Sequence, residues 1–200
     1  MDTESLFRVI LSSLIVGFVT HRAYYTRRLR ASRADGPLQP TRDKASSPAD
    51  LLSLPALLAM AIYIIRPEWL AWSSLPLPPW LRWIGVGVAI LGFGLLQWSQ
   101  VTLGRNWSDS PQILRGQTLT THGPYRWLRH PIYAAFLMIL GSSLLIAANW
   151  LVGLLWFAMT ALDVRPRILL EEALMIAQFG DSYREYMRFA GALLPRRLLP

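Results

Sequence analysis

Residues 131–162, PIYAAFLMILGSSLLIAANWLVGLLWFAMTAL, contain no charged side chain. A helix needs about 20 apolar residues to cross the core of a bilayer. The stretch is therefore too long for one straight span and barely long enough for two, and Asn149 lies near its middle. We predict a hairpin of two short or tilted transmembrane helices that turns around Ala148 and Asn149.

Three further apolar runs precede this hairpin, at about 6–25, 51–65 and 81–103. The chain of 200 residues is 53% hydrophobic and only 16% charged, a composition outside the range of ordinary soluble domains. We expect an all-α integral membrane protein with about five transmembrane helices. Its length allows a single membrane domain over residues 1–200, in which residues 1–80 supply two spans and a flexible basic loop at 22–50.

Four glycines occur inside the run 81–103, namely Gly85, Gly87, Gly92 and Gly94. Small residues within a transmembrane helix allow a neighbouring helix to approach closely. A phosphate-binding glycine loop would instead lie between a strand and a helix. The glycines therefore predict helix packing and give no indication of a Rossmann fold.

The arginines indicate how the chain is oriented in the membrane. Basic residues cluster in the segments 22–44, 105–129 and 165–197, which five spans would place on the same side. Positive charge accumulates on the cytoplasmic side of membrane proteins. We therefore expect these segments and the C-terminus to be cytoplasmic and the N-terminus to lie outside. The net charge of +8 then reflects topology, and nucleic acid is not an expected partner.

Two polar segments flank the charge-free stretch: GPYRWLRHPIY at 123–133 and RILLEEALMIAQFGDSYREY at 167–186. The predicted hairpin would bring both to one membrane face, where they could form a polar site. Taken alone, His130 is as well explained by a place at the start of a helix, and Arg167 with Glu171 by a surface ion pair. No metal is expected, because the chain has no cysteine and its three histidines match no metal-ligand spacing.

The order of several segments resembles the isoprenylcysteine carboxyl methyltransferase family, which is related to membrane phospholipid methyltransferases. These segments are LGRNWS (103–108), QTLTTHGPYRWLRHPIY (117–133), RILLEE (167–172), and FGDSYREYMRF (179–189) followed by LLP (193–195). The resemblance covers roughly residues 81–195 and predicts a catalytic core over 81–200. It implies a helical membrane enzyme with S-adenosylmethionine in a cytosol-facing pocket that the C-terminal helical region closes.

The resemblance also implies roles for individual residues. Arg167 corresponds to the position that holds a substrate carboxylate, and Glu172 would orient Arg167, so these two are the predicted catalytic residues. A carboxylate can accept hydrogen bonds from the amino or ribose groups of the cofactor, and tyrosine rings can pack on its adenine or sulfonium. The predicted cofactor-binding residues are Gln117, Thr118, Leu119, Thr120, Tyr125, His130, Pro131, Ile132, Tyr133 and Glu171.

The expected reaction is O-methylation of the carboxylate of a lipophilic, isoprenylcysteine-like acceptor, either a small molecule or a lipid that enters from among the membrane lipids. Because a carboxylate is already ionised at neutral pH, the main task of the enzyme is positioning. The high arginine content and short length are typical of a bacterial protein, here one of the inner membrane. Three alternatives remain open: a phospholipid N-methyltransferase, an NADPH-dependent membrane reductase, and a non-enzymatic membrane scaffold.

Overall fold

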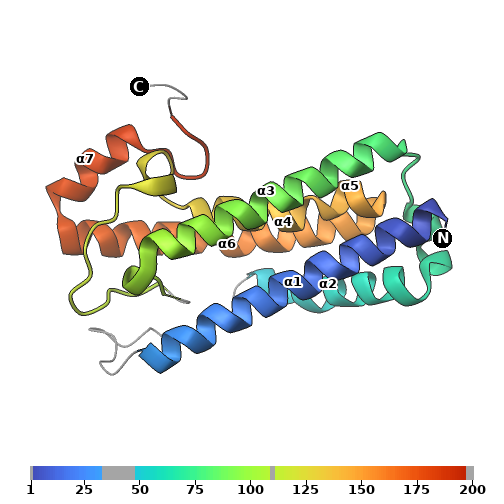
Figure 1. Ribbon diagram of the computed structural model, residues 1–200, viewed down its shortest axis with the longest axis horizontal. Coiled ribbons are helices and arrows are strands. Elements are labelled where there is room, and N and C mark those ends of the chain that lie inside the picture. The colour runs from blue at the N-terminus through green and yellow to red at the C-terminus, as the bar shows by residue number, and fades with distance from the viewer. Residues whose placement is uncertain (1, 33–47, 109–110, 197–200) are drawn as a thin grey trace. The chain divides into compact units, whose positions relative to one another are not determined.

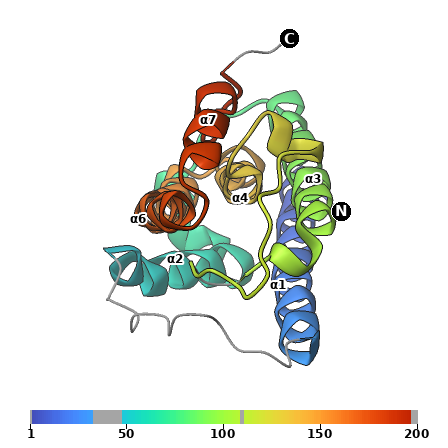
Figure 2. The same ribbon diagram turned by 90° about the vertical axis from the view of Figure 1, so that its left-hand side faces the viewer.

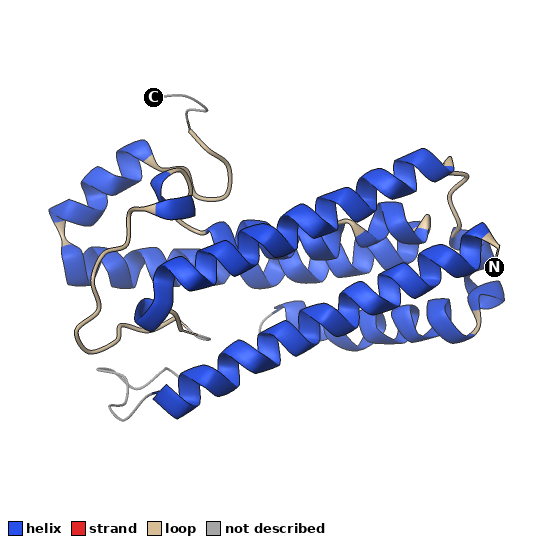
Figure 3. Cartoon of the chain, viewed as in Figure 1, coloured by secondary structure: helices blue, strands red, loops and turns tan. Residues whose placement is uncertain are grey.

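The computed structural model describes residues 2–32, 48–108 and 111–196, and every regular element in these ranges is helical (Figures 1 and 3). The α-helices are α1 (Thr3–Ser32), α2 (Pro48–Ile65), α3 (Pro79–Leu103), α4 (Pro131–Gly141), α5 (Ser143–Ala147), α6 (Trp150–Phe179) and α7 (Asp181–Phe189). The short 3-10 helices are η1 (Pro67–Ser73), η2 (Gly104–Asn106) and η3 (Gly123–Arg126). The predicted all-α class is confirmed.

The chain forms two compact units. The first comprises Met1–His21, Ser46–Phe93 and Ala135–Asp163, and the second comprises Arg22–Ala45, Gly94–Ala134 and Val164–Pro200. Helices α1, α3, α4 and α6 each contribute residues to both units. The predicted division into residues 1–80 and a catalytic core at 81–200 stays a prediction.

Two helical segments are long and apolar enough to cross a membrane, Thr3–Arg28 and Pro79–Asn106. A third span results if Ala49–Ile65 and Pro67–Ser73, which meet at a bend of 115°, count as one broken span. The described residues therefore support two or three spans of the five expected. The apolar stretch Pro131–Ala147 is shorter than a full span, and the apolar start of α6 continues without a break into charged residues.

The first unit contains a helical turn within the predicted hairpin stretch, whereas the prediction that both arms are transmembrane spans stays a prediction. Helix α5 ends at Ala147, Ala148 adopts a left-handed conformation (φ 48°), and α6 begins at Trp150. Asn149 is buried and caps α6, because its Oδ1 accepts from the backbone N–H of Val152 at 3.1 Å. The prediction of a turn at Ala148 and Asn149 is therefore confirmed.

The amide group of Asn149 also fastens this turn to η1. Its Nδ2 donates to the carbonyl of Leu70 at 3.1 Å and to the hydroxyl of Ser73 at 2.8 Å. Asn149 therefore has a partner for both ends of its amide, as a buried polar group requires.

Only two of the four glycines of α3 serve the close packing that the sequence predicts. A Cβ atom at Gly85 would lie 2.8 Å from Leu145 Cβ, and one at Gly92 would lie 2.8 Å from Ile139 Cγ1. A Cβ at Gly87 or Gly94 would meet no described atom within 4 Å. Gly85 and Gly92 are seven residues apart and so lie on one side of the helix, and Gly87 and Gly94, also seven apart, lie on a different side that meets no close neighbour.

Arg82, near the start of α3, is buried inside the first unit with a relative exposure of 2%. Its guanidinium donates to Glu4 at 2.5 Å and to the carbonyl of Ile146 at 2.9 Å and 3.0 Å, and it covers the ring of Phe7 at 4.1 Å. Burial of an arginine is tolerated because nearly every donor finds an acceptor. Arg82 thus links α1, α3 and the end of α5.

The basic loop begins later than predicted. Helix α1 extends to Ser32, so residues 22–32 are helical and not part of a loop. Arginine, leucine and alanine, which dominate this stretch, all favour helix. Residues 33–47 of the predicted loop lie outside the described residues, and residues 48–50 are the first turn of α2.

Asn149→Ala should lower the free energy of unfolding by about 2–3 kcal/mol, because it removes the cap of α6 together with the buried amide hydrogen bonds to the carbonyl of Leu70 and the hydroxyl of Ser73. Thermal denaturation in detergent measures the change. The matched control is Ser74→Ala, since Ser74 is exposed and its hydroxyl contacts only the carbonyl of Ala71 among the described residues. Equal destabilisation by the two variants would contradict the capping role.

Candidate functional site

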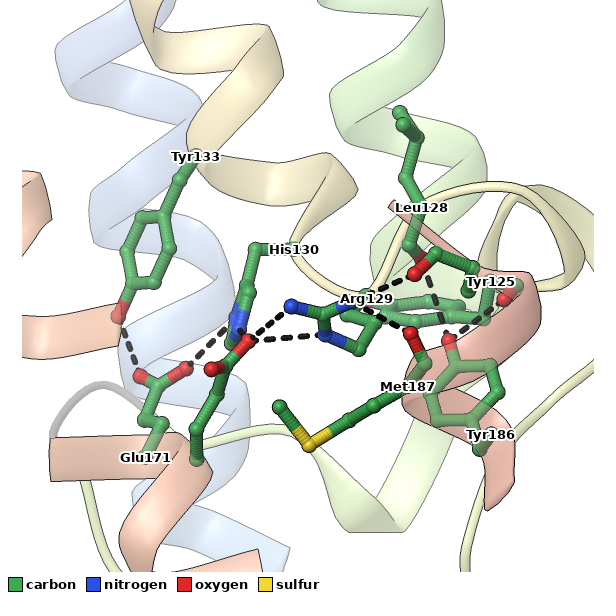
Figure 4. Close-up of polar contacts among 10 residues, drawn as sticks. Tyr125, Leu128, Arg129, His130, Tyr133, Glu171, Tyr186 and Met187 are labelled. Carbon is green, nitrogen blue, oxygen red and sulfur yellow. Dashed lines mark hydrogen bonds and ion pairs between the residues drawn. The ribbon is translucent and has the colours of Figure 1, made fainter. Parts of the chain in front are cut away.

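A cluster of polar side chains lies in the second unit, where three parts of the chain meet (Figure 4). The segment from η3 to the first turn of α4 provides Tyr125, His130 and Tyr133, and α6 provides Glu171 and Glu172. The third part is α7 with the residues that follow it. Gly180 has a positive φ of 55° and lies at the turn between α6 and α7. In both views, α7 lies near the end of α6 (Figures 1 and 2).

His130 lies between the two glutamates. Its Nδ1 is 3.3 Å from Glu171 Oε2, and its Nε2 is 3.2 Å from Glu172 Oε1. The ring is buried and stacks on Tyr133, whose hydroxyl donates to Glu171 Oε1. Since both ring nitrogens face a carboxylate, the arrangement fits an imidazole that carries a proton on each nitrogen.

Arg129 completes the cluster from the other side. Its Nε and one terminal nitrogen lie 2.8 Å and 2.7 Å from Glu172 Oε1, the same oxygen that faces His130. The second terminal nitrogen donates to the carbonyl of Ala190 at 2.5 Å and lies 3.4 Å from that of Met187. Arg129 is 9% exposed, so these contacts replace its hydration.

The backbone also joins this segment to the residues after α7. The N–H groups of Arg129 and His130 donate to the carbonyls of Gly191 and Ala192 at 2.7 Å and 3.0 Å, and the N–H of Gly191 donates back to Trp127 at 3.0 Å. The result is a short parallel pairing centred on Leu128 and Gly191. It holds the C-terminal residues 190–192 against the start of α4.

Tyr186 on α7 fixes the same segment one turn earlier. Its hydroxyl donates to the carbonyl of Tyr125 at 2.5 Å and contacts that of Leu128 at 3.3 Å. Tyr125 is 6% exposed, and burial raises the pKa of its hydroxyl well above the ordinary value. Tyr125 is therefore a neutral side chain in this site.

The glutamates and His130 shift each other's protonation. Burial lowers the pKa of His130, but its hydrogen bonds to Glu171 and Glu172 outweigh burial, and the pKa is raised above its ordinary value. The pKa of Glu172 is lowered, first by the hydrogen bond from His130 and then, against the effect of burial, by Arg129. The cluster therefore favours a protonated His130 beside an ionised Glu172.

The predicted cofactor segment 117–120 lies beside the end of α3 and beside α6. Asn106 Nδ2 donates to the hydroxyls of Thr118 and Thr120 at 3.1 Å and 3.2 Å. The side-chain amide of Gln117 reaches Met175 Sδ on α6 at 3.7 Å, and its Oε1 accepts from the N–H of Leu114 at 2.8 Å. These contacts give an otherwise irregular segment a defined course.

The predicted site residues thus fall into groups. One hydrogen-bonded network contains His130, Tyr133, Glu171 and Glu172. Asn106 donates hydrogen bonds to both Thr118 and Thr120. The first turn of α4 contains Pro131 and Ile132. Leu119 lines a groove next to α7. Arg167 is half-buried on α6, one turn before Glu171. Glu172 contacts Arg129 and His130, so the idea that it orients Arg167 stays a prediction.

Sequence reasoning missed Arg129, Asn106 and Tyr186 as parts of this arrangement. Arg129 precedes His130 in a basic loop, where arginines are expected for topological reasons alone. Its burial depends on an ion pair with Glu172, 43 positions later in the chain. The only available signal was the pattern RHP directly before an apolar helix.

Comparison with known proteins agrees with this fold. The sequence model of the Isoprenylcysteine carboxyl methyltransferase (ICMT) family matches residues 83–177. Protein-S-isoprenylcysteine O-methyltransferase from Tribolium castaneum is 32% identical over 125 residues, which cover 58% of this chain and 42% of that protein. Methanethiol S-methyltransferase from Mycobacterium tuberculosis (strain ATCC 25618 / H37Rv) is 33% identical over 122 residues, which cover 58% and 46%.

A solved structure has the same fold. It is described as that of the eukaryotic intramembrane Ras methyltransferase ICMT without a monobody, and it matches with a TM-score of 0.72 at 20% identity over 98% of this chain and 68% of that one. The chain spans less than half the length of the two relatives named above. It is an integral membrane protein with apolar helices, and it belongs to the isoprenylcysteine carboxyl methyltransferase family.

Proposed function

We propose that this chain is an S-adenosylmethionine-dependent methyltransferase that methylates the carboxylate of a lipophilic acceptor. The observation that carries the proposal is the environment of Glu171: this carboxylate accepts from Tyr133 and faces His130 at the start of α4, the places where the family resemblance puts cofactor contacts. Membership in a methyltransferase family supports the reaction class. The acceptor is a proposal, since the relatives include both an isoprenylcysteine and a methanethiol methyltransferase.

The groups around Glu171 are chemically suited to the proposed cofactor. S-adenosylmethionine supplies an electrophilic methyl group on a sulfonium and also carries an ammonium, a carboxylate, a ribose and an adenine. Glu171 would accept from the amino or ribose groups, and the rings of Tyr125 and Tyr133 would pack against adenine or sulfonium. Backbone N–H groups in the first turn of α4 suit the carboxylate end. Each part of the cofactor therefore has a partner of the right kind.

Arg167 is the proposed group for the acceptor. It lies on α6 one turn before Glu171, so a carboxylate bound to its guanidinium would be close to the residues that hold the cofactor. A guanidinium binds a carboxylate through two parallel hydrogen bonds and thereby fixes its orientation. Because an ionised carboxylate needs no base, these residues only have to align it with the methyl group of the cofactor and exclude water.

A thiol or an amine is the second candidate acceptor, and two observations favour it. One relative is a methanethiol S-methyltransferase. In addition, the carboxylates of Glu171 and Glu172 beside His130 are proton-accepting groups that a carboxylate substrate does not require. A thiol or an ammonium loses a proton on methylation, and a carboxylate oxygen of Glu171 or Glu172 could receive it.

We further propose that the site and the C-terminus face the cytoplasm, on the basis of the arginine distribution.

Glu171→Gln should weaken the binding of S-adenosylhomocysteine, the demethylated cofactor, about tenfold, because the variant removes the negative charge that attracts its amino group. Isothermal titration calorimetry with detergent-purified protein measures the change. The control is Glu68→Gln, since Glu68 is exposed and pairs with Arg66 at 3.7 Å in the first unit. If the unaltered protein binds S-adenosylhomocysteine and Glu171→Gln binds it with the same affinity, Glu171 does not contribute to the cofactor site.

Arg167→Lys should slow methyl transfer to N-acetyl-S-farnesylcysteine at least about tenfold and leave the affinity for S-adenosylhomocysteine unchanged, because lysine cannot hold a carboxylate through two parallel bonds. A radiolabelled methyl-transfer assay at saturating cofactor measures the rate. Arg165→Lys is the matched control, since Arg165 is exposed on the same helix. A fully active Arg167→Lys would refute the two-bond grip.

His130 should stabilise the fold in a pH-dependent way. Because its pKa is raised above the ordinary 6.5, its contribution is fully present below about pH 6.5 and is lost as the pH rises through the folded-state pKa. The pKa of Glu172 is lowered below the ordinary 4.5, so the contribution of Glu172 is present above that pH and is lost as the pH falls through its folded-state pKa.

The difference in thermal midpoint between the unaltered protein and His130→Gln should therefore be largest between pH 4.5 and 6.5 and shrink in alkaline buffer. Differential scanning fluorimetry across this range measures it. A difference that stays constant into alkaline buffer would mean that His130 does not carry the second proton.

A further inference from the structure

A groove of about 320 Å³ lies in the second unit between the segment 119–126 and α7. None of His130, Tyr133, Glu171 and Glu172 lines this groove. Tyr186 lines it and also holds the segment before His130, through its hydroxyl. Its lining residues are Leu119, Thr121, Arg126, Ser182, Glu185, Tyr186 and Phe189. The volume is in the range of a small ligand group.

The charged groups of the groove have opposite signs. Arg126 on η3 contributes a cation, and Glu185 on α7 contributes an anion, and both side chains are exposed. The hydroxyls of Thr121 and Ser182 add uncharged donors and acceptors. A ligand that matches this wall carries a negative and a positive charge a short distance apart, together with oxygen atoms.

The rim of the groove is aromatic and faces away from the protein core. Phe189 lines the groove and is 69% exposed. The guanidinium of Arg126 stacks over Trp127 at 4.9 Å, and Trp127 contacts Trp98 at a centroid distance of 6.0 Å. Trp98 belongs to the candidate span Pro79–Asn106 and lies near its end, where tryptophans mark the boundary between bilayer core and head groups.

We propose that this groove binds the head group of a zwitterionic bilayer phospholipid such as phosphatidylethanolamine. Arg126 binds the phosphate, Glu185 binds the ammonium, and the hydroxyls of Thr121 and Ser182 bind ester or phosphate oxygens. The acyl chains leave over Phe189 and Trp127, whose exposed rings are the kind of surface that lipid chains cover.

The pair of charges decides between classes of lipid. Arg126 alone would favour any phosphodiester, and an anionic lipid most of all. Glu185 disfavours an additional negative charge and favours an ammonium, so the groove selects a lipid whose head group is neutral overall. The site does not depend on which molecule accepts the methyl group.

Native mass spectrometry of the detergent-purified full chain, titrated with phosphatidylethanolamine or phosphatidylglycerol, tests the proposal. The unaltered protein should retain one phosphatidylethanolamine at about tenfold lower lipid concentration than phosphatidylglycerol. Arg126→Gln and Glu185→Gln should each weaken phosphatidylethanolamine binding about tenfold. Arg184→Gln is the matched control and should change nothing, since Arg184 is exposed on the same helix and pairs with Asp181 at 2.9 Å.

A charge reversal gives a result that a folding defect cannot imitate. Glu185→Lys should switch the preference to phosphatidylglycerol, because the groove then carries two cations. Equal binding of both lipids by the unaltered protein, or no switch in Glu185→Lys, would overturn the proposal. So would displacement of the lipid by S-adenosylhomocysteine, or an Arg126→Gln variant that loses affinity for this compound as strongly as for the lipid, since the groove would then belong to the cofactor.

Discussion

The contact between Arg129 and Glu172 is the constraint on which the rest of the second unit depends. Arg129 is almost fully buried, and a buried guanidinium is stable only if its donors are satisfied and its charge is balanced. Glu172 supplies the charge, and the carbonyls of Met187 and Ala190 supply further acceptors. A single side chain thereby connects the start of α4, the middle of α6 and the end of α7.

The same oxygen of Glu172 also faces His130, so the arginine and the histidine share one anion. His130 in turn faces Glu171, which leaves Glu171 oriented by Tyr133 and His130 together. Orientation of a ligand-binding carboxylate by other side chains lowers the cost of holding it ready for a ligand. The proposed cofactor residue Glu171 is thus oriented by two further residues of the same proposed site.

The features that the sequence predicted well are those that a local pattern determines. The absence of charge over residues 131–162 with a polar Asn149 at its middle was enough to predict the hairpin and its turn. The two polar segments around the hairpin meet in the second unit, where His130 contacts Glu171 and Glu172. Side-chain periodicity and charge distribution are read directly from the chain, so these inferences needed no knowledge of distant contacts.

The features that the sequence did not predict depend on contacts between distant residues or on local breaks. A basic loop contains several arginines, and only the folded chain distinguishes the buried Arg129 from the exposed Arg126. Gly87 and Gly94 looked equivalent to Gly85 and Gly92 until their helical face was known. The described residues give two or three candidate spans, because Ala49–Ile65 and Pro67–Ser73 meet at a sharp bend and because the apolar start of α6 shares its helix with Asp163, Arg165 and Arg167, so the expected five spans stay a prediction.

The parallel pairing of Leu128 with Gly191 has a consequence for the order of events during biosynthesis. Residues 127–130 are synthesised more than 60 positions before their backbone partners, so this pairing cannot form until translation has passed Gly191 and Ala192. Until translation reaches them, Arg129 lacks the Ala190 carbonyl as well, and contacts of such large sequence separation form late. The site therefore cannot be completed until the residues that follow α7 have been synthesised.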